Sequence, residues 1–356
     1  MTSSSSSSDN SSSAVVSMNG SGEGDTSYAN NSNFQRFIAS VTRKARRDMA
    51  AALYRALGRP ASLAIADLGC GTGPNALLMV SDAVDAVLAE IEEEAPLQLR
   101  VFLNDLPAND FNAVFRLLPS SPLAGTGCLV SAWPGSFYRR VFPEASLDYV
   151  VSSSSLHFLS KFHADFLALL SCRAAETRAR GLLLLTFVGR RAARPTAHDC
   201  YLWDLLADAL MDMAAAGLVD EERVHSFNAP YYAPCPDDLA RVIAEEGSFA
   251  LRTLQLFDTT RRHLLLGGGP ASRHPTSSNK HDGDDELPRW LAAETAATIK
   301  AVVEPMLRTH FGWAAMDGLF CRYRLLLEAY YRSKATRNKD DITNVFLVLE
   351  KKQRCY

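Results

Sequence analysis

Apolar runs and segments of helical periodicity alternate through the first half of the chain. The apolar runs predict strands at 62–67, 98–104, 127–132, 147–152 and 181–188. Apolar positions at helical spacing predict helices at 75–93, 109–118 and 162–178. An amphipathic helix, with apolar positions from Phe34 to Leu53, precedes them. This alternation predicts an α/β fold with a doubly wound, mostly parallel sheet.

The second half of the chain is mainly helical. Its pattern predicts helices at 199–216, 236–246, 288–308 and 313–332, and strands at 248–256 and 343–349. We expect the two strands to close the sheet as a terminal antiparallel pair, and the helices to form a cap from elements at about 199–246 and 287–335. Residues 267–286 are rich in Gly, Ser, Pro and Asp, which predicts a mobile loop. We therefore expect a single domain over 18–356, after a disordered Ser-rich tail at 1–17.

The composition is that of an ordinary globular protein with a small-molecule partner. Net charge is -3 and the pI is near 6.3, so no basic surface for nucleic acid is expected. No apolar run approaches the roughly 20 residues that span a bilayer. The seven cysteines are scattered without a C-x-x-C pair, and no Lys or Arg precedes Arg36 as a transit peptide would require. We expect a cytoplasmic protein that contacts neither nucleic acid nor membrane.

A glycine-rich loop, Asp67–Asn75, directly follows the first predicted strand. It has neither the spacing of a dinucleotide fingerprint nor the lysine of a P-loop. A short G-x-G-x-G after an aspartate is instead typical of enzymes that bind S-adenosylmethionine, although a tight turn without a ligand is the alternative. Asp105 ends the second strand, so its carboxylate and that of Asp67 are expected in one crevice. Asp105 is suited to accept both ribose hydroxyl protons, and Asp67 lies near the amino-acid portion. Either residue alone is equally explained as a helix cap.

Several motifs make the chain resemble the plant SABATH methyltransferases from about Met18 to the C-terminus. They are Ser27–Ser32 (SYANNS), Asp67–Asn75 (DLGCGTGPN), Asn104–Phe111 (NDLPANDF), Pro134–Tyr138 (PGSFY), Ser155–Leu159 (SLHFL) and Phe227–Tyr232 (FNAPYY). The salicylate and benzoate carboxyl methyltransferases are the most similar branch. The resemblance implies a Rossmann-like class I methyltransferase fold, S-adenosylmethionine as methyl donor and a homodimer.

The resemblance also implies a set of residues around the cofactor. They are Tyr28, Ser32, Asp67, Gly69, Cys70, Asn75, Asp105, Leu106, Ser136 and Phe137. Phe137 can stack on adenine, and Ser136 can bond its exocyclic amine. Without the family, Pro134–Tyr138 reads as a turn with an aromatic core residue.

We expect the acceptor acid beneath the cap, held by residues that position it without acting as a base. They are Gln35 and His157 for the carboxylate, and Phe158, Trp203, Tyr231 and Tyr232 as an aromatic sleeve. A carboxyl group with a pKa of about 4 is already ionised at neutral pH, so methyl transfer needs no general base. Alignment of the reactants can supply roughly 7–11 kcal/mol. The alternatives are a core histidine at position 157 and a helix-packing tryptophan at position 203.

The chain departs from the family pattern at several points. Phe158 replaces the usual tryptophan, Ser154 replaces a tyrosine, and a few dozen residues that normally follow Ser160 are missing. The family's magnesium ligands would fall at Phe227 and Asn228, but His225 stands where an acidic ligand is expected. We therefore expect no well-formed magnesium site.

We predict methyl-ester formation on a small aromatic acid such as salicylate, benzoate or anthranilate. The alternatives are jasmonate, indole-3-acetate or a xanthine nitrogen as acceptor. A cofactor-binding relative with impaired catalysis is a further alternative, because of the segment missing after Ser160.

Overall fold

The computed structural model describes residues 33–91, 97–156, 162–260, 283–333, 336 and 341–353. Several predictions lie outside these residues. They are the tail at 1–17, the cofactor residues Tyr28 and Ser32, the substrate residues His157 and Phe158, and the expected loop up to residue 282.

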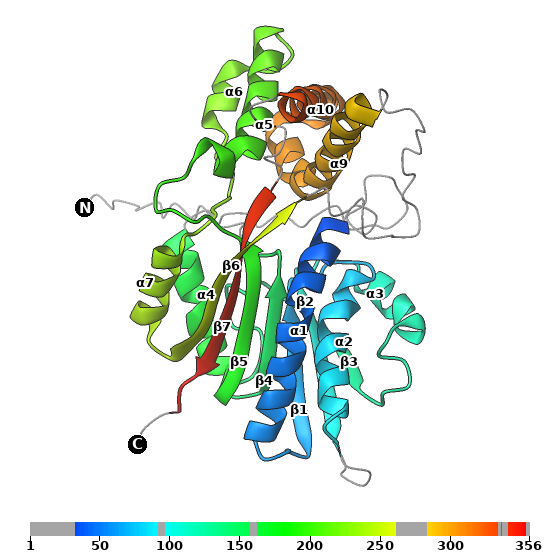
Figure 1. The fold of residues 1–356 in the computed structure, drawn as a ribbon, viewed down its shortest axis with the longest axis vertical. Coiled ribbons are helices and arrows are strands. Elements are labelled where there is room, and N and C mark those ends of the chain that lie inside the picture. Colours follow the sequence, from blue (N-terminus) through cyan, green and yellow to red (C-terminus); the bar gives the residue numbers. More distant parts are fainter. Residues whose placement is uncertain are drawn as a thin grey trace, which may run out of the picture.

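Within the described residues, the strands form one seven-stranded sheet in the order β3-β2-β1-β4-β5-β7-β6 (Figure 1). The strands are β1 (Ser62–Leu68), β2 (Gln98–Asp105), β3 (Leu129–Pro134), β4 (Leu147–Ser153), β5 (Thr177–Val188), β6 (Phe249–Thr260) and β7 (Asp341–Lys351). The first five are parallel, and β7 runs antiparallel between β5 and β6. The doubly wound sheet and its terminal antiparallel pair are both confirmed.

Helices cover both faces of the sheet, as Figure 1 shows. On one face, α1 (Asn33–Ala56) packs on α2 (Asn75–Leu88), and on the other α4 (Phe162–Glu176) packs on α7 (Pro236–Glu246). The short helix α3 (Phe111–Leu117) follows β2, and a 3-10 turn, η1 (Leu118–Ser120), continues it. Successive residues of β5 alternate between the two layers, with Leu184 in one apolar core and Leu183 and Leu185 in the other. Burial on both faces explains why the strand contains four consecutive leucines, Leu182–Leu185.

The remaining helices form a separate bundle beyond one end of the sheet (Figure 1). They are α5 (Ala197–Ala215), α6 (Glu221–Ser226), α9 (Gly283–Phe311) and α10 (Met316–Arg332), with the 3-10 turn η2 (Trp313–Ala315) between the last two. Side chains of α5, α9 and α10 share a third apolar core. We call this bundle the cap.

Parts of the cap differ from the sequence expectation. Helix α7, expected within the cap at 199–246, packs against α4 and β6 on the sheet instead, because its Leu239, Val242 and Ile243 belong to the core of that layer. Helix α6 was not predicted. Helix α9 begins at Gly283, so residues 283–286 of the expected mobile loop are its first turn.

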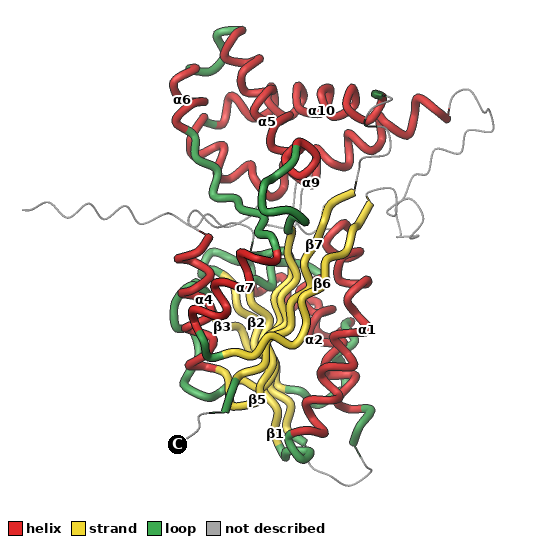
Figure 2. Tube along the Cα trace, turned by 60° about the vertical axis from the view of Figure 1, so that its left-hand side comes forward, coloured by secondary structure: helices red, strands yellow, loops and turns green. Residues whose placement is uncertain are grey.

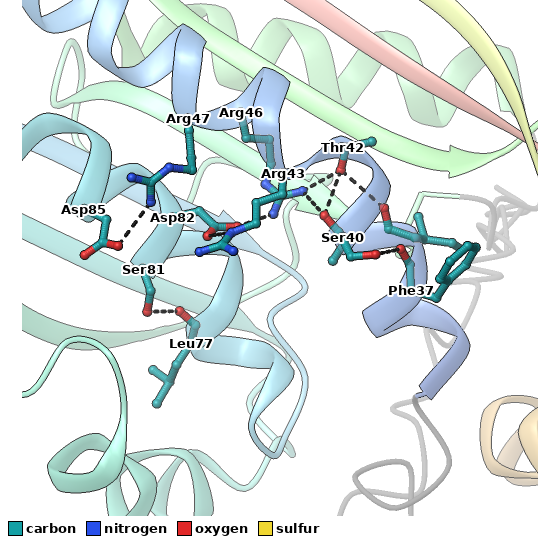
Figure 3. Close-up of polar contacts among 12 residues, drawn as sticks. Phe37, Ser40, Thr42, Arg43, Arg46, Arg47, Leu77, Ser81, Asp82 and Asp85 are labelled. Carbon is teal, nitrogen blue, oxygen red and sulfur yellow. Dashed lines mark hydrogen bonds and ion pairs between the residues drawn. The ribbon is translucent and has the colours of Figure 1, made fainter. Parts of the chain in front are cut away.

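Ion pairs join the two helices that cover the first face of the sheet (Figure 3). The carboxylate of Asp82 on α2 accepts from Arg43 at 2.7 Å and from Arg46 at 2.6 Å, both on α1. Arg46 is 1% exposed, whereas the neighbouring pair of Arg47 and Asp85 is much more open to solvent. The buried pair therefore fixes how α1 packs on the helix that follows the glycine loop.

We expect Asp82→Ala to lower the free energy of unfolding by about 3 kcal/mol, because it leaves the Arg46 guanidinium buried without its carboxylate. Urea denaturation measures this loss. Asp85→Ala on the same helix is the matched control, with an expected change of about 0–1 kcal/mol for an exposed pair. Equal losses in the two variants would show that burial of the pair is not what matters.

Candidate active site

The loop after β1 turns sharply on its glycines. Gly69, Gly71 and Gly73 have φ of 75°, 68° and 92°, in the left-handed region that side chains other than glycine rarely adopt. The backbone N–H groups of Gly69 and Cys70 both donate to the carbonyl of Asn104, at 2.9 and 3.0 Å. The loop is thereby held against the end of β2, as the sequence predicted for a crevice at the carboxyl ends of the strands.

Gly69 also lies against two segments from elsewhere in the chain. A Cβ at this position would lie 2.7 Å from Cβ of Ser155 and 3.3 Å from the ring of Phe137. The Ser155 hydroxyl donates to the Gly69 carbonyl at 3.1 Å. The absence of a side chain at position 69 thus brings the loop, the residues after β4 and the PGSFY segment together. Sequence reasoning missed Ser155, although it stands in the same motif as His157.

The carboxylate of Asp105 is fixed by backbone donors on both oxygens. It accepts from Gly71 N–H at 2.6 Å and from Leu106 N–H at 2.7 Å. Burial raises the pKa of Asp105, while these two hydrogen bonds oppose the rise. Each carboxylate oxygen retains a further lone pair, so the oriented group can still accept two hydroxyl protons of a ligand. Asn109 donates to the Gly71 carbonyl at 3.0 Å and steadies the same turn.

Asp67 lies beside Asp105 and is 3% exposed. Burial, and then the charge of Asp105, raise the pKa of Asp67 to about 8. Burial also raises the pKa of the Cys70 thiol, so this cysteine is a neutral contact rather than a nucleophile. A cationic ligand in the crevice would favour the ionised form of Asp67.

We expect the stability gained by Asp67→Asn to depend on pH. The folded-state pKa of Asp67, about 8, lies above the ordinary value of about 3.9, so folding favours the protonated acid. The parent protein therefore loses stability as pH rises through this interval, and the uncharged variant does not. Urea denaturation of both proteins without ligand should show a difference that grows from about pH 4 to about pH 8 and is constant above it. A difference that is constant across this range would contradict the raised pKa.

The segment after β3, which carries Ser136 and Phe137, is held from two sides. The side chain of Asn104 donates to the carbonyls of Trp133 and Gly135 at 2.7 and 3.0 Å. From α4, the guanidinium of Arg173 donates to the carbonyls of Phe137 and Arg139 at 2.9 and 3.0 Å. Ser136 and Phe137 are partly buried, at the edge of the crevice.

An ion pair with no solvent exposure lies behind this segment. Arg173 and Glu176 are both 0% exposed, and their side chains approach to 2.7 Å. Glu176 also accepts from the N–H groups of Val141 and Phe142 at 2.7 and 3.0 Å. Arg173 and Glu176 thus hold both ends of the turn around Phe137. Neither was identified from the sequence, although two opposite charges three residues apart in an apolar helix are a visible signal.

The beginnings of α1 and α2 meet at the edge of the crevice. Arg36 donates to the side-chain oxygen of Asn75 at 3.1 Å. Gln35, next in sequence, is partly buried, and its side-chain oxygen accepts no hydrogen bond among the described residues. The structure therefore brings α1 to the predicted cofactor residue Asn75 through Arg36, and leaves the Gln35 side-chain oxygen available to an N–H or O–H donor.

The expected aromatic sleeve is divided. The rings of Trp203 on α5 and Tyr231 lie 4.9 Å apart at a tilt of 43°, where the cap meets the sheet domain. Tyr232 faces elsewhere: its ring stacks on Phe162 at 4.8 Å, and its hydroxyl donates to Asp238 at 3.0 Å. Tyr231 therefore packs on a cap residue, whereas Tyr232 packs on the sheet side.

The predicted metal-binding positions lie on the cap surface. His225 is exposed and pairs with Glu221 at 3.5 Å, while the ring of Phe227 packs 5.4 Å from that of Phe311. Asn228 is exposed. Among the residues that the structure describes, no three His, Cys, Asp or Glu side chains gather in a way that could hold a metal ion. No helix among the described residues has both the length and the apolar character needed to cross a membrane.

Comparison with known proteins explains this arrangement of crevice and cap. A family model described as SAM-dependent carboxyl methyltransferase matches residues 13–162 and 160–352. The chain belongs to the SABATH family of S-adenosylmethionine-dependent carboxyl methyltransferases. The two matched segments overlap at 160–162, next to the point after Ser160 where the resemblance implies missing residues.

Curated relatives align with nearly the whole of this carboxyl methyltransferase. Jasmonate O-methyltransferase of Arabidopsis thaliana is 36% identical, over 91% of this chain and 96% of its own. Salicylate carboxymethyltransferase of Clarkia breweri is 34% identical, over 95% and 98%. A solved loganic acid methyltransferase with SAH has a TM-score of 0.79 at 26% identity, and covers 95% of this chain and 99% of its own.

S-adenosylmethionine is the methyl donor of this enzyme, and the crevice fits it. The missing side chain at Gly69 lets the loop pack against Ser155 and Phe137, and Asp105 presents fixed acceptors at the end of β2. The buried Asp67 carboxyl suits the positively charged methionine end. The individual cofactor contacts stay predictions.

Proposed function

We propose that this carboxyl methyltransferase forms the methyl ester of a small aromatic acid of the salicylate, benzoate or anthranilate type. The observation that carries the proposal is the pair of Trp203 and Tyr231, whose rings face each other at 4.9 Å where the cap meets the sheet. The two rings are in contact with each other, and together they would offer a planar acceptor an aromatic surface to pack against, since rings prefer offset or tilted packing at about 4.5–7 Å. Relatives named as salicylate and benzoate carboxyl methyltransferases, at 33–34% identity, support the same class.

The proposed reaction depends on position rather than on proton transfer. S-adenosylmethionine supplies a methyl group bound to a positively charged sulfur. The acceptor, ionised at neutral pH, presents one carboxylate oxygen to that methyl carbon; the new O–C bond forms as the C–S bond breaks. Gln35 and His157 would hold the carboxylate, and Asp105 would hold the ribose. Water exclusion by the cap and alignment of the three atoms would supply the rate acceleration.

Jasmonate is the second candidate acceptor, because a jasmonate O-methyltransferase is among the most similar relatives at 36% identity. A labelled-methyl assay with salicylate, benzoate, anthranilate, jasmonate, indole-3-acetate and a xanthine separates the candidates. We expect kcat/KM for one aromatic acid to exceed that for jasmonate about tenfold, which corresponds to about 1.4 kcal/mol. A preference for jasmonate would overturn the aromatic assignment.

Paired variants test the role of the aromatic rings. Trp203→Ala should raise KM for the aromatic acid without changing the affinity for S-adenosylmethionine. Trp313→Ala is the matched control, because that tryptophan is 71% exposed on the cap. If calorimetry detects cofactor binding but no acid yields an ester, the chain is the non-catalytic relative considered above. The homodimer and the cytoplasmic location remain predictions.

A further inference from the structure

We propose that Arg190 is a positioning residue for the acid acceptor, which it serves by fixing the joint between the cap and the sheet. The inference rests on the proposed function, in which Tyr231 and Trp203 line the acid pocket. Arg190 does not reach the pocket itself. Its contacts determine where the Tyr231 segment lies.

Arg190 connects the two places where the chain passes between sheet and cap. It follows the end of β5, from which the chain enters α5, and it contacts the segment by which the chain returns from α6 to α7. Figure 2 shows these connecting loops between the cap and the sheet. The backbone N–H of Arg190 donates to the Pro234 carbonyl at 3.0 Å. Its guanidinium donates to the carbonyl of Ala193 at 3.1 Å and to that of Ala233.

The same guanidinium organises the side of the return segment that faces the sheet. It donates to the Asp238 carboxylate at 2.9 Å and to the Tyr232 hydroxyl at 3.1 Å, and it lies 5.0 Å from the centre of the Tyr232 ring. Phe162 covers the ring at 4.8 Å. Asp238 in turn accepts from the N–H of Cys235 at 3.0 Å, which fixes the start of α7.

These contacts require the side chain of an arginine. Arg190 is 6% exposed, and the planar fork of an arginine can bond several carbonyls and a carboxylate at once, which a lysine cannot. Gly189 allows the close approach, because a Cβ there would lie 2.9 Å from the Pro234 carbonyl oxygen. Burial disfavours ionisation of Asp238, but hydrogen bonds and the charge of Arg190 outweigh it and hold the pKa of Asp238 below its usual value.

Tyr231 is the residue through which this joint reaches the acceptor. It precedes Tyr232 in the chain, and its ring packs against Trp203 of the cap. A displacement of Tyr232 therefore moves Tyr231 with it. The structure thus assigns Tyr232, predicted as a wall of the acid pocket, to the Arg190 joint instead.

The experiment compares Arg190→Met with Arg191→Met in the full chain. Arg191 is the neighbouring arginine, but it is exposed and pairs only with Asp258, at 2.6 Å, among the described residues. We expect Arg190→Met to lower kcat/KM for the acid about 30-fold, since a misplacement of ~1 Å can cost roughly 100-fold. The Kd for S-adenosylmethionine should stay within about twofold of the parent value, because the cofactor crevice is formed by other segments. Arg191→Met should match the parent in both quantities.

Tyr232→Phe is the milder variant, in case Arg190→Met does not fold. It keeps the ring on Phe162 but removes the hydroxyl, so a smaller loss with the same split between acid and cofactor is expected. Arg190→Lys should restore only part of the activity. Unchanged acid kinetics in both Arg190→Met and Tyr232→Phe would overturn the inference, as would an equal loss of acid and cofactor affinity.

Hydrogen exchange separates failure of this inference from failure of the proposed function. Arg190→Met, but not Arg191→Met, should speed exchange of the non-proline amides at 191–196 and 227–233. If the parent forms no ester from any acid, the proposed function fails, and this exchange pattern still decides whether Arg190 fixes Tyr231. Unchanged exchange would overturn the inference whichever acid is accepted.

Discussion

Asp105→Ala should weaken S-adenosylmethionine binding about 100-fold, the equivalent of about 3 kcal/mol. The substitution removes an oriented carboxylate at the end of β2, together with its charge-assisted hydrogen bonds to the ribose. In the parent protein Asp105 accepts hydrogen bonds from the N–H groups of Gly71 and Leu106 at 2.6 and 2.7 Å. The substitution also removes these two bonds, so the glycine turn loses this attachment to the end of β2. Titration calorimetry with S-adenosylmethionine or its demethylated product measures the change.

Asp110→Ala is the matched control for this prediction. Asp110 belongs to the same motif, but its side chain caps α3 by accepting from Ala113 N–H at 2.9 Å. Its removal should cost about 1 kcal/mol of stability, as for other helix caps, with cofactor affinity unchanged. If Asp105→Ala binds the cofactor as tightly as the parent, Asp105 does not hold the ribose.

The sheet could be predicted because its signal is local. The four consecutive leucines Leu182–Leu185 and Phe187 belong to the cores on the two sides of the sheet, and only a strand covered on both faces buries such a run. Which helices belong to the cap could not be predicted in the same way. Helix α7 has the same amphipathic pattern whether it packs on α5 or on α4, and only the tertiary fold places Leu239 in the sheet layer.

The active site, too, has parts that the sequence predicts and parts that it does not. The glycine loop and Asp105 were predictable, because strand ends and turn residues fix backbone geometry within a few positions. The different partners of Tyr231 and Tyr232 could not be predicted, since the motif contains both tyrosines and the place of Tyr232 depends on Asp238 and Arg190. Contacts between residues far apart in sequence, such as that of Arg173 with the Phe137 carbonyl, leave no periodic signal.

Arg173→Met should lower the free energy of unfolding by about 4 kcal/mol, because removing one partner of a fully buried ion pair leaves the other uncompensated. Glu176, 0% exposed, would keep only the N–H groups of Val141 and Phe142 and the more distant Arg140, at 3.4 Å. Cofactor affinity should fall as well, since the Phe137 carbonyl loses its donor from Arg173 at 2.9 Å. Urea denaturation gives the first quantity and calorimetry the second.

A second substitution separates the loss of charge balance from the loss of shape. Arg173→Met combined with Glu176→Gln removes both charges, yet the amide oxygen can still accept from Val141 and Phe142, so much of the stability should return. Cofactor affinity should not return, because no donor to the Phe137 carbonyl is restored. The exposed pair of Arg252 and Glu350 is the control, and Arg252→Met should leave the urea midpoint almost unchanged. If the double variant is as unstable as Arg173→Met alone, the buried charge of Glu176 is not the cause, and Arg173 acts through its bonds to the turn around Phe137.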